Sequence, residues 1–277
     1  MRKILLLCSL AACLMPLKNA AQNSEPERKK PKGNFYISWG YNREAYTRST
    51  IHFRNNGNPE LKDQFGVYDF KIYKAKAEDR PDFYALTDIK NFTIPQFSCR
   101  VGYYFNNNKD EGFELNYDHA KYVVSEGQTV RIKGNAFGVA FDKDTIIDSH
   151  YIHFEHTDGA NFMMFNYLKR WKLWKSNNQK SNIGIVVKPG LGFVLPRTDV
   201  TIFGNRLNND WHIAGVVTGV ETGARLEFFK YFCAEFTGKI GYANYVSCLV
   251  QGKGNGKASH QFGFAETILT LGFQYPF

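Results

Sequence analysis

The sequence predicts an all-β protein: a closed, antiparallel, up-and-down β-barrel that crosses a membrane, with eight strands as the preferred number. Three observations carry this prediction. Apolar residues recur at every second position in eight segments, the opposite faces of these segments carry glycine and isolated charges, and short and long connections alternate between them. Period-two alternation is typical of strands with one apolar face, and the other two observations indicate which face meets the membrane.

The eight alternating segments follow one another along the chain. In the first of them, Phe35, Ile37, Trp39 and Tyr41 share one face. The eight segments are 35–41, 97–105, 113–117, 160–171, 183–193, 214–228, 232–246 and 269–277.

The number of strands depends on three further stretches that also alternate. These are 51–54, 67–75 and 129–137. They form hairpins that rise from the first two long loops, or they join the barrel and raise the strand number to ten or twelve. We expect the eight-stranded form.

The polar faces distinguish a barrel from a water-soluble sandwich. A sandwich would turn its polar faces to solvent and favour Lys, Thr and Glu there. Glycines and single charges of both signs suit the narrow interior of a small closed barrel, where charges must pair. Mixed charges in a narrow lumen predict a plug and no selective pore. The residues predicted to form lumen ion pairs are Arg100, Glu114, Asp118, Lys188, Glu221, Arg225, Glu227, Glu235, Lys239 and Glu266.

The connections between segments also favour a membrane barrel. Short turns at 106–110, 176–181 and 229–231 alternate with longer connections, which are 44–92, 123–158, 196–210 and 248–259. Membrane barrels show this asymmetry between their two ends. Several segments exceed the roughly 9–11 residues that a bilayer requires, so the barrel is expected to project beyond the membrane on the long-loop side.

The first 32 residues differ in composition from the rest. Residues 1–21 have a basic start, a short apolar run and small residues before a cleavage point near Ala21, which predicts a secretory signal peptide. Cys13 also fits a lipoprotein lipidation motif, as an alternative. Residues 22–32 are polar and charged and predict a disordered leader, so the folded barrel is expected to span 33–277.

Charge and cysteine usage exclude several other classes of protein. The net charge of +9 falls to +6 when the three basic residues of the signal are removed, which gives no nucleic-acid-binding stripe. No later apolar run is long enough for a transmembrane helix. Cys99, Cys233 and Cys248 are odd in number and widely spaced, so we expect no disulfide scaffold. The dispersed histidines show no ligand spacing, and we expect no metal site and no cofactor; these histidines are His52, His150, His212 and His260.

Together, the signal peptide, the eight segments and the last strand resemble an outer-membrane β-barrel of Gram-negative bacteria. In that class the long loops are external, the short turns are periplasmic, and an aromatic C-terminal strand implies recognition by the barrel-assembly machinery. The resemblance implies outer-membrane lipid and lipopolysaccharide as partners, and a monomer. The residues of the expected insertion signal are Leu269, Leu271, Phe273, Tyr275 and Phe277.

One group of polar residues could carry chemistry. His119, His156 and Asp158 follow the third segment or enter the fourth. A histidine beside a carboxylate can act as a general base, and the same residues could instead bind a divalent cation through histidine and aspartate oxygen. The stretch weakly resembles the His-x-Ser stretch of lipid A deacylase barrels, which implies a lipid A-modifying hydrolase. It departs from that stretch because Asp158 stands where the nucleophilic serine should be, after Thr157.

Three functions therefore remain open from the sequence. The first is a structural or surface-interaction protein that acts through its long outer loops. The second is the hydrolase with His119, His156 and Asp158, and the third is a narrow channel. Lys121, Lys169 and Arg170 are candidates for contact with lipopolysaccharide phosphates, since Lys and Arg bind phosphate directly. Ordinary rim structure is the competing interpretation of the His/Asp group, and snorkelling of the side chains at an interface is that of the three basic residues.

Overall fold

The computed structural model describes residues 33–57, 66–80, 96–105, 110–156, 158–250 and 256–277. All of them belong to the compact unit Pro31–Phe277. The expected signal peptide and leader lie outside the described residues. Within them, no helix is long and apolar enough to cross a membrane.

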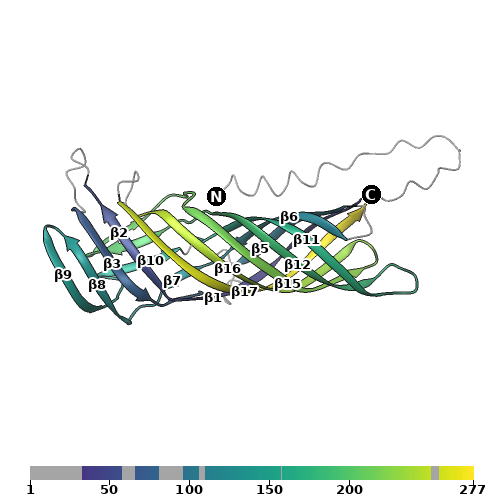
Figure 1. The fold of residues 1–277 in the computed structure, drawn as a ribbon, viewed down its shortest axis with the longest axis horizontal. Helices are drawn as coiled ribbons and strands as arrows, with labels where there is room; N and C mark the ends of the chain where they lie inside the picture. The colour runs from purple at the N-terminus through teal and green to yellow at the C-terminus, as the bar shows by residue number, and fades with distance from the viewer. Residues whose placement is uncertain (1–32, 58–65, 81–95, 106–109, 157, 251–255) are drawn as a thin grey trace, which may run out of the picture. The chain divides into compact units, whose positions relative to one another are not determined.

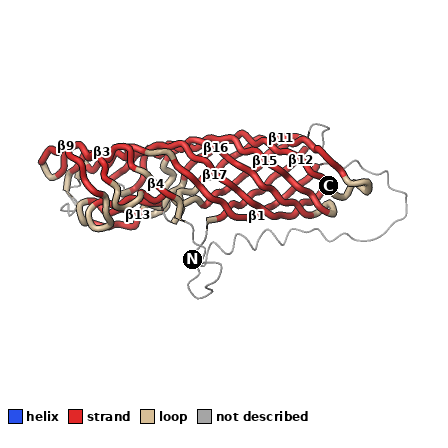
Figure 2. The backbone as a smooth tube through the Cα atoms, turned by 90° about the horizontal axis from the view of Figure 1, so that it is seen from below, coloured by secondary structure: helices blue, strands red, loops and turns tan. Residues whose placement is uncertain are grey.

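Eight antiparallel strands form a closed ring (Figures 1 and 2). Pairing of the first strand with the last closes it, with Ile37 opposite Phe273. The predicted all-β, up-and-down barrel of eight strands is confirmed. The ring strands, in order around the ring, are β1 (Gly33–Tyr46), β5 (Phe97–Phe105), β6 (Glu111–His119), β11 (Phe162–Lys175), β12 (Asn182–Val194), β15 (Gly215–Phe228), β16 (Phe232–Leu249) and β17 (Gly256–Pro276).

Short turns lie together at one end of the ring, on the right in Figure 1. The tightest joins β15 to β16, where Phe229 and Lys230 have φ angles of 53° and 71° and Tyr231 N–H donates to the Phe228 carbonyl at 3.2 Å. Three residues separate the paired Phe228 and Phe232, and positive φ at both central residues of the turn gives a twist that matches the flanking strands. The last ring strand also ends here, so the C-terminus lies at this same end.

At the other end, further strands build a second region, which we call the extension. After β1 the chain turns and forms β2. β2 pairs with the start of β17, the strand that β1 also pairs with, and His52 lies opposite Ser259. β3, β8 and β9 continue this sheet outward, and a five-stranded sheet forms beside it. The extension strands are β2 (Ser49–Asn55), β3 (Tyr68–Ala75), β8 (Thr129–Ala136) and β9 (Val139–Ile146), with β4 (Ala77–Glu78), β7 (Tyr122–Val124), β10 (Ile152–His156), β13 (Asp199–Ile202) and β14 (Asn205–Asn208) in the second sheet.

The extension settles the role of the three stretches that left the strand number open. They form β2, β3 and β8, which pair with one another above the ring and are not inserted into its wall. The expected loop at 248–259 is shorter than predicted, because β16 continues to Leu249 and β17 begins at Gly256. Two ring strands therefore run on into the extension.

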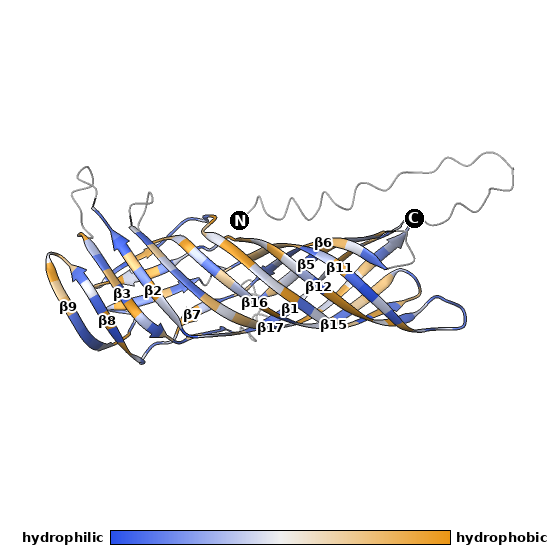
Figure 3. Ribbon diagram, viewed as in Figure 1, coloured by the Kyte–Doolittle hydropathy of each residue, from blue (hydrophilic) through white to orange (hydrophobic). Residues whose placement is uncertain are grey.

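The outer face of the ring is an apolar surface, which we call the belt. Hydrophobic and hydrophilic residues alternate along the ring strands in Figure 3, and the exposed members include Leu115, Leu191, Ile240, Leu271 and Phe273. Monomeric soluble proteins rarely expose apolar patches above a few hundred Å². A belt that encircles a closed ring has the form required for contact with hydrocarbon.

The extension has the opposite arrangement, with aromatic side chains inside. Phe53 stacks on Phe70 with ring centroids 5.1 Å apart and meets Phe154 edge-on at 5.4 Å. Phe70 also contacts Phe203 at 5.1 Å. These rings come from both sheets, so the extension is a two-layer structure around an apolar core.

Candidate functional site

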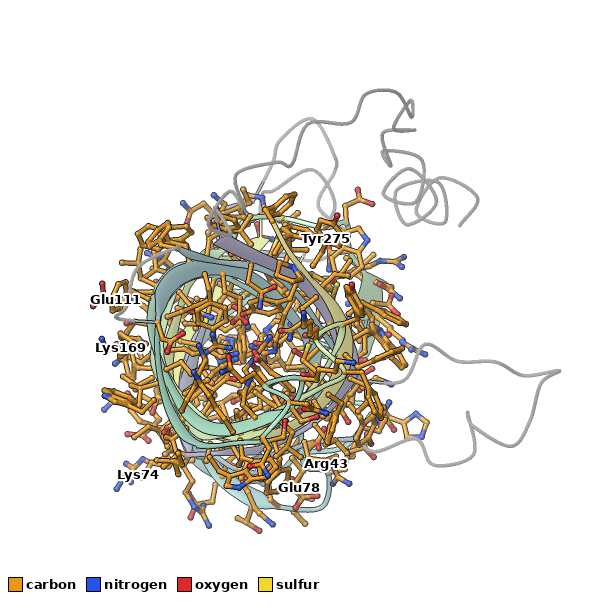
Figure 4. The ribbon with its side chains drawn as sticks, turned by 90° about the vertical axis from the view of Figure 1, so that its right-hand side faces the viewer. Arg43, Lys74, Glu78, Glu111, Lys169 and Tyr275 are labelled. Atoms are coloured by element: carbon orange, nitrogen blue, oxygen red, sulfur yellow. The ribbon has the colours of Figure 1, made fainter. Side chains whose placement is uncertain are left out.

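Charged side chains from neighbouring strands fill the lumen of the ring. The ten predicted lumen residues are all buried. They meet because inward-facing residues of adjacent antiparallel strands lie opposite one another, as Lys188 lies opposite Glu221. Figure 4, viewed from the short-turn end, shows side chains throughout the inside of the ring, while Glu111, Lys169 and Tyr275 lie on its outside.

Lys188 is the centre of this network. Its Nζ atom lies 2.9 Å from Oε2 of Glu114, 2.5 Å from Oε2 of Glu235 and 3.4 Å from Oε1 of Glu221. These three carboxylates come from three different strands, β6, β16 and β15. One ammonium group therefore ties several sides of the ring together across the lumen.

Two further cations extend the network toward the extension. Arg100 Nη1 lies 3.2 Å from Glu114 Oε1 and 2.9 Å from Glu221 Oε2. Lys239 contacts Asp118, and its Nζ lies 2.9 Å from Glu266 Oε2. Glu114 and Glu221 are thus shared between cations, which makes the pairs one connected group.

Toward the short turns the network continues through two arginines. Arg225 Nη1 donates to Glu235 Oε1 at 2.6 Å, and its Nε donates to Glu227 Oε1 at 3.0 Å. Arg170 also contacts Glu227, and its Nη2 donates to Asp110 Oδ1 at 2.8 Å. The pairing therefore runs along the lumen to the short-turn end.

Two tyrosines pack beneath these guanidinium groups. The Arg225 guanidinium lies 4.4 Å from the ring centroid of Tyr36, and that of Arg170 lies 4.2 Å from the centroid of Tyr104. A Cβ atom at Gly102 would lie 2.3 Å from the Tyr36 ring. Glycine is therefore required at that position, because any side chain would displace the tyrosine from the lumen.

The arrangement closes the lumen. Arg100 and Arg225 have no measurable exposure, and Lys188 is 1% exposed. Removing one partner of a buried ion pair typically costs about 3–5 kcal/mol, because the other charge is left uncompensated. The network therefore favours a fixed plug over an open passage.

The three residues of the possible hydrolase each contact different partners. His119 Nδ1 lies 2.8 Å from Asn161 Oδ1, and Asp158 pairs with Arg197 at 2.7 Å. His156 is fully buried, and burial lowers its pKa to about 3. A general base needs access to substrate and a pKa near the working pH, and His156 has neither. Thr157 lies outside the described residues.

The three basic residues that are candidates for phosphate contact lie in different parts of the molecule. Lys169 and Arg170 lie in the second half of β11, toward the short turns; Lys169 pairs with Glu111 at 3.1 Å, and Arg170 belongs to the lumen network. Lys121 is buried beneath the extension, where its carbonyl accepts a hydrogen bond from Tyr46. The three do not form a common phosphate-binding surface.

One cluster was missed by sequence reasoning. His156, Cys248 and His260 converge in the interior where β10 meets β16 and β17, although they lie up to 104 residues apart. A register shift in β16 between Tyr245 and Cys248 turns both side chains inward. No local sequence signal marks that bulge, so alternation alone could not place Cys248.

Comparisons with known proteins give limited information. No family model matches the chain, and no curated protein matches it. The attachment invasion locus protein Ail of Yersinia pestis, solved in complex with the heparin analogue sucrose octasulfate, is 10% identical with a TM-score of 0.33, over 88% of this chain and 99% of that chain. The outer membrane protein OprG from Pseudomonas aeruginosa is 12% identical with a TM-score of 0.36, over 88% and 97%. The outer membrane protein AlkL, solved in DMPC bilayers, is 9% identical with a TM-score of 0.28, over 95% and 97%. At these scores the similarity carries no argument about function.

Proposed function

We propose that this chain is an outer-membrane β-barrel with a closed lumen, which presents its extension at the cell surface as an interaction scaffold. The single observation that carries the proposal is the arrangement of the ring, with hydrocarbon side chains outside and paired charges inside. This is the arrangement expected of a protein whose solvent is lipid. The N-terminal export signal expected from the sequence supports the same location.

The orientation follows from the two ends of the ring. Outer-membrane barrels have short periplasmic turns and longer extracellular connections. The turns at 176–181 and 229–231 would therefore lie in the periplasm, and the extension would lie outside the cell. The C-terminal strand, which ends in exposed apolar residues such as Leu271 and Phe273, would serve as the signal for the barrel-assembly machinery.

Two measurements test location and closure. In cell fractionation, the protein is expected in the outer membrane and released only by detergent; recovery in the soluble fraction would contradict the proposal. In planar bilayers, the purified barrel is expected to give no stable conductance. Stable openings from the wild-type protein would show that the lumen network is not a plug and would favour the channel.

The outer face of the extension supports a preference for anionic ligands. Lys257 lies directly opposite Arg54, and Lys71 lies directly opposite Lys133. Like charges directly opposite each other on one face destabilise a sheet. Asp142, 3.2 Å from Lys133, and Asp69, opposite Arg54, compensate them in part, and a bound anion would add to this compensation. We call these four residues the basic face.

Lipopolysaccharide phosphates are the proposed ligand, because Lys and Arg make charge-assisted hydrogen bonds to phosphate and the basic face would lie above the outer leaflet. The double variant Lys71→Glu/Lys133→Glu is expected to weaken binding of lipopolysaccharide to the purified protein at least tenfold. Enzymatic removal of the lipopolysaccharide phosphates is expected to weaken wild-type binding similarly.

The matched control is Lys180→Glu, which changes an exposed lysine in a short turn at the opposite end of the ring. It is expected to leave binding unchanged. Equal losses in the control and the double variant, or no loss in either, would remove the basic face as the binding surface.

A further inference from the structure

The cluster of His156, Cys248 and His260 lies in the interior above the belt. Its residues come from β10, β16 and β17, and all three side chains are buried. On β17 the residues around His260 face water, since Lys257 and Gln261 are exposed, while the exposed apolar residues begin lower on the strand. The cluster is therefore separate from the lumen network and from the basic face.

The donor atoms of the cluster are close enough to share one ion. Nε2 of His156 lies 3.1 Å from Nε2 of His260 and 3.9 Å from Sγ of Cys248. One ligand atom from each residue lies within 4.8 Å of both others. Metal–nitrogen bonds of about 2.0–2.1 Å and metal–sulfur bonds of about 2.3 Å place such donors about 3.3–3.8 Å apart. Shifts of up to about 1 Å would therefore bring the three around a common centre.

A hydrogen bond from the protein orients one of the imidazoles. Nδ1 of His156 lies 3.1 Å from Oγ1 of Thr198, which can accept the Nδ1 proton and leave the Nε2 lone pair directed at the other two donors. Second-shell hydrogen bonds of this kind fix the tautomer of metal-ligating histidines. Nε2 of His260 lies within hydrogen-bond distance of His156, and its Nδ1 is buried without a hydrogen-bond partner among the described residues.

The protonation state of the histidines is also suitable. Burial lowers the pKa of His156 to about 3, and burial followed by repulsion from His156 lowers the pKa of His260 well below its usual value. Burial also raises the pKa of the Cys248 thiol, so its proton leaves only as the metal binds; ligation requires this thiolate together with the two neutral imidazoles.

The aromatic residues around the cluster favour an ion whose charge one thiolate neutralises completely. The Tyr245 ring stacks on His156 at 5.1 Å and on His260 at 4.7 Å, and Phe154 lies edge-on to His156 at 4.9 Å. Uncompensated charge is costly in such surroundings. A divalent ion bound to one thiolate would leave one positive charge buried, whereas a monovalent ion would leave none. Soft thiolate ligands also favour Cu(I).

We propose that His156, Cys248 and His260 form a buried three-coordinate site for Cu(I). Binding replaces the S–H bond of Cys248 with a copper–sulfur bond and releases one proton to solvent, and no electron is transferred. The expectation of no metal site rests on spacing in the sequence, which carries no information on residues that the register of distant strands brings together.

The test is an anaerobic titration of the folded barrel in detergent with Cu(I), in competition with a chromogenic Cu(I) chelator. We expect one equivalent per barrel, and at least hundredfold weaker binding in Cys248→Ser and in His260→Gln. The matched control, Cys233→Ser, changes another buried free cysteine of the same strand and is expected to bind like the wild type. Absence of wild-type binding, or an equal loss in the control, would overturn the proposal.

Copper X-ray absorption of the loaded wild-type protein keeps the test independent of variants that fail to fold. One sulfur and two nitrogen neighbours are expected, and a shell without sulfur would overturn the assignment. A parallel titration with Zn(II) tests the choice of ion. Tighter binding of Zn(II) than of Cu(I) would refute the argument from buried charge.

Discussion

The ring carries its apolar side chains on the outside and the extension carries them on the inside, although two strands, β16 and β17, run through both regions. On the ring part of β17, Leu269 and Leu271 face outward and Glu266 faces the lumen. On its extension part the outward face carries Lys257, while Phe262 is buried. The change occurs within one continuous strand. The medium outside therefore decides which face is apolar, and the strand geometry remains the same.

The largest effect is expected from the centre of the lumen network. Lys188→Met removes the cation shared by Glu114, Glu221 and Glu235, and three carboxylates then lose a partner in a closed interior. We expect a loss of about 3–5 kcal/mol, measured by urea unfolding in detergent or by the loss of heat-modifiable migration on gels. The matched control is Lys257→Met on the exposed face of the extension, and equal stabilities of the two variants would contradict the plug.

A similar loss, confined to the other region, is expected from the extension core. Phe70→Ala removes contacts with Phe53 and Phe203, and such truncations cost about 3–5 kcal/mol. Hydrogen exchange is expected to quicken in β2, β3 and β8 while the ring strands stay protected. Uniform loosening of ring and extension would show that the two regions are one cooperative unit.

A smaller effect should distinguish the two outer faces. Leu271 and Val139 are 67% and 66% exposed, one on the ring and one on the extension. Leu271→Arg is expected to cost about 2–4 kcal/mol, because it places a charge in hydrocarbon. Val139→Arg should change stability by less than about 0.5 kcal/mol. Unfolding in lipid vesicles measures both, and similar costs would refute the assignment of lipid to one face only.

The smallest effect concerns pH and the extension alone. The hydrogen bond to Glu155 and the negative charges of Glu155 and Glu126 raise the pKa of His153, with Nε2 lying 3.0 Å from Glu155. A raised pKa stabilises the fold below the unfolded value of about 6.5, and the stabilisation is lost as pH rises through the folded value. Hydrogen exchange of the β10 amides should therefore be slower at pH 6.5 than at pH 8.5, after correction for the intrinsic effect of pH on the exchange rate. His153→Gln should abolish the difference, and its persistence in that variant would assign the effect to another group.

The ring could be predicted from sequence because its signal is local. Every second residue of a strand shares a face, so the inward positions of Arg100 and Lys239 follow from counting within one segment. The predicted first segment ends at 41 and so leaves out Glu44, which continues the inward phase of Tyr36 and Asn42 and accepts a hydrogen bond from Asn42.

The extension and its cluster could not be predicted in the same way. Three of its strands, β2, β3 and β8, fall in the stretches expected as possible hairpins within the loops, but its reversed pattern depends on strands that pair over long separations, such as β3 with β8. Cys248 faces inward because of a bulge, and His156 reaches His260 through packing of two sheets. Residue spacing carries no information on either.

The central claim is that hydrocarbon surrounds the ring and water surrounds the extension. Hydroxyl-radical footprinting of the native protein in lipid vesicles tests it directly, with mass spectrometry as the readout. Phe236 on the ring is 60% exposed and Phe137 on the extension is 56% exposed, so their geometric access is matched. We expect rapid oxidation of Phe137 and protection of Phe236. Equal oxidation of the two residues would contradict the account.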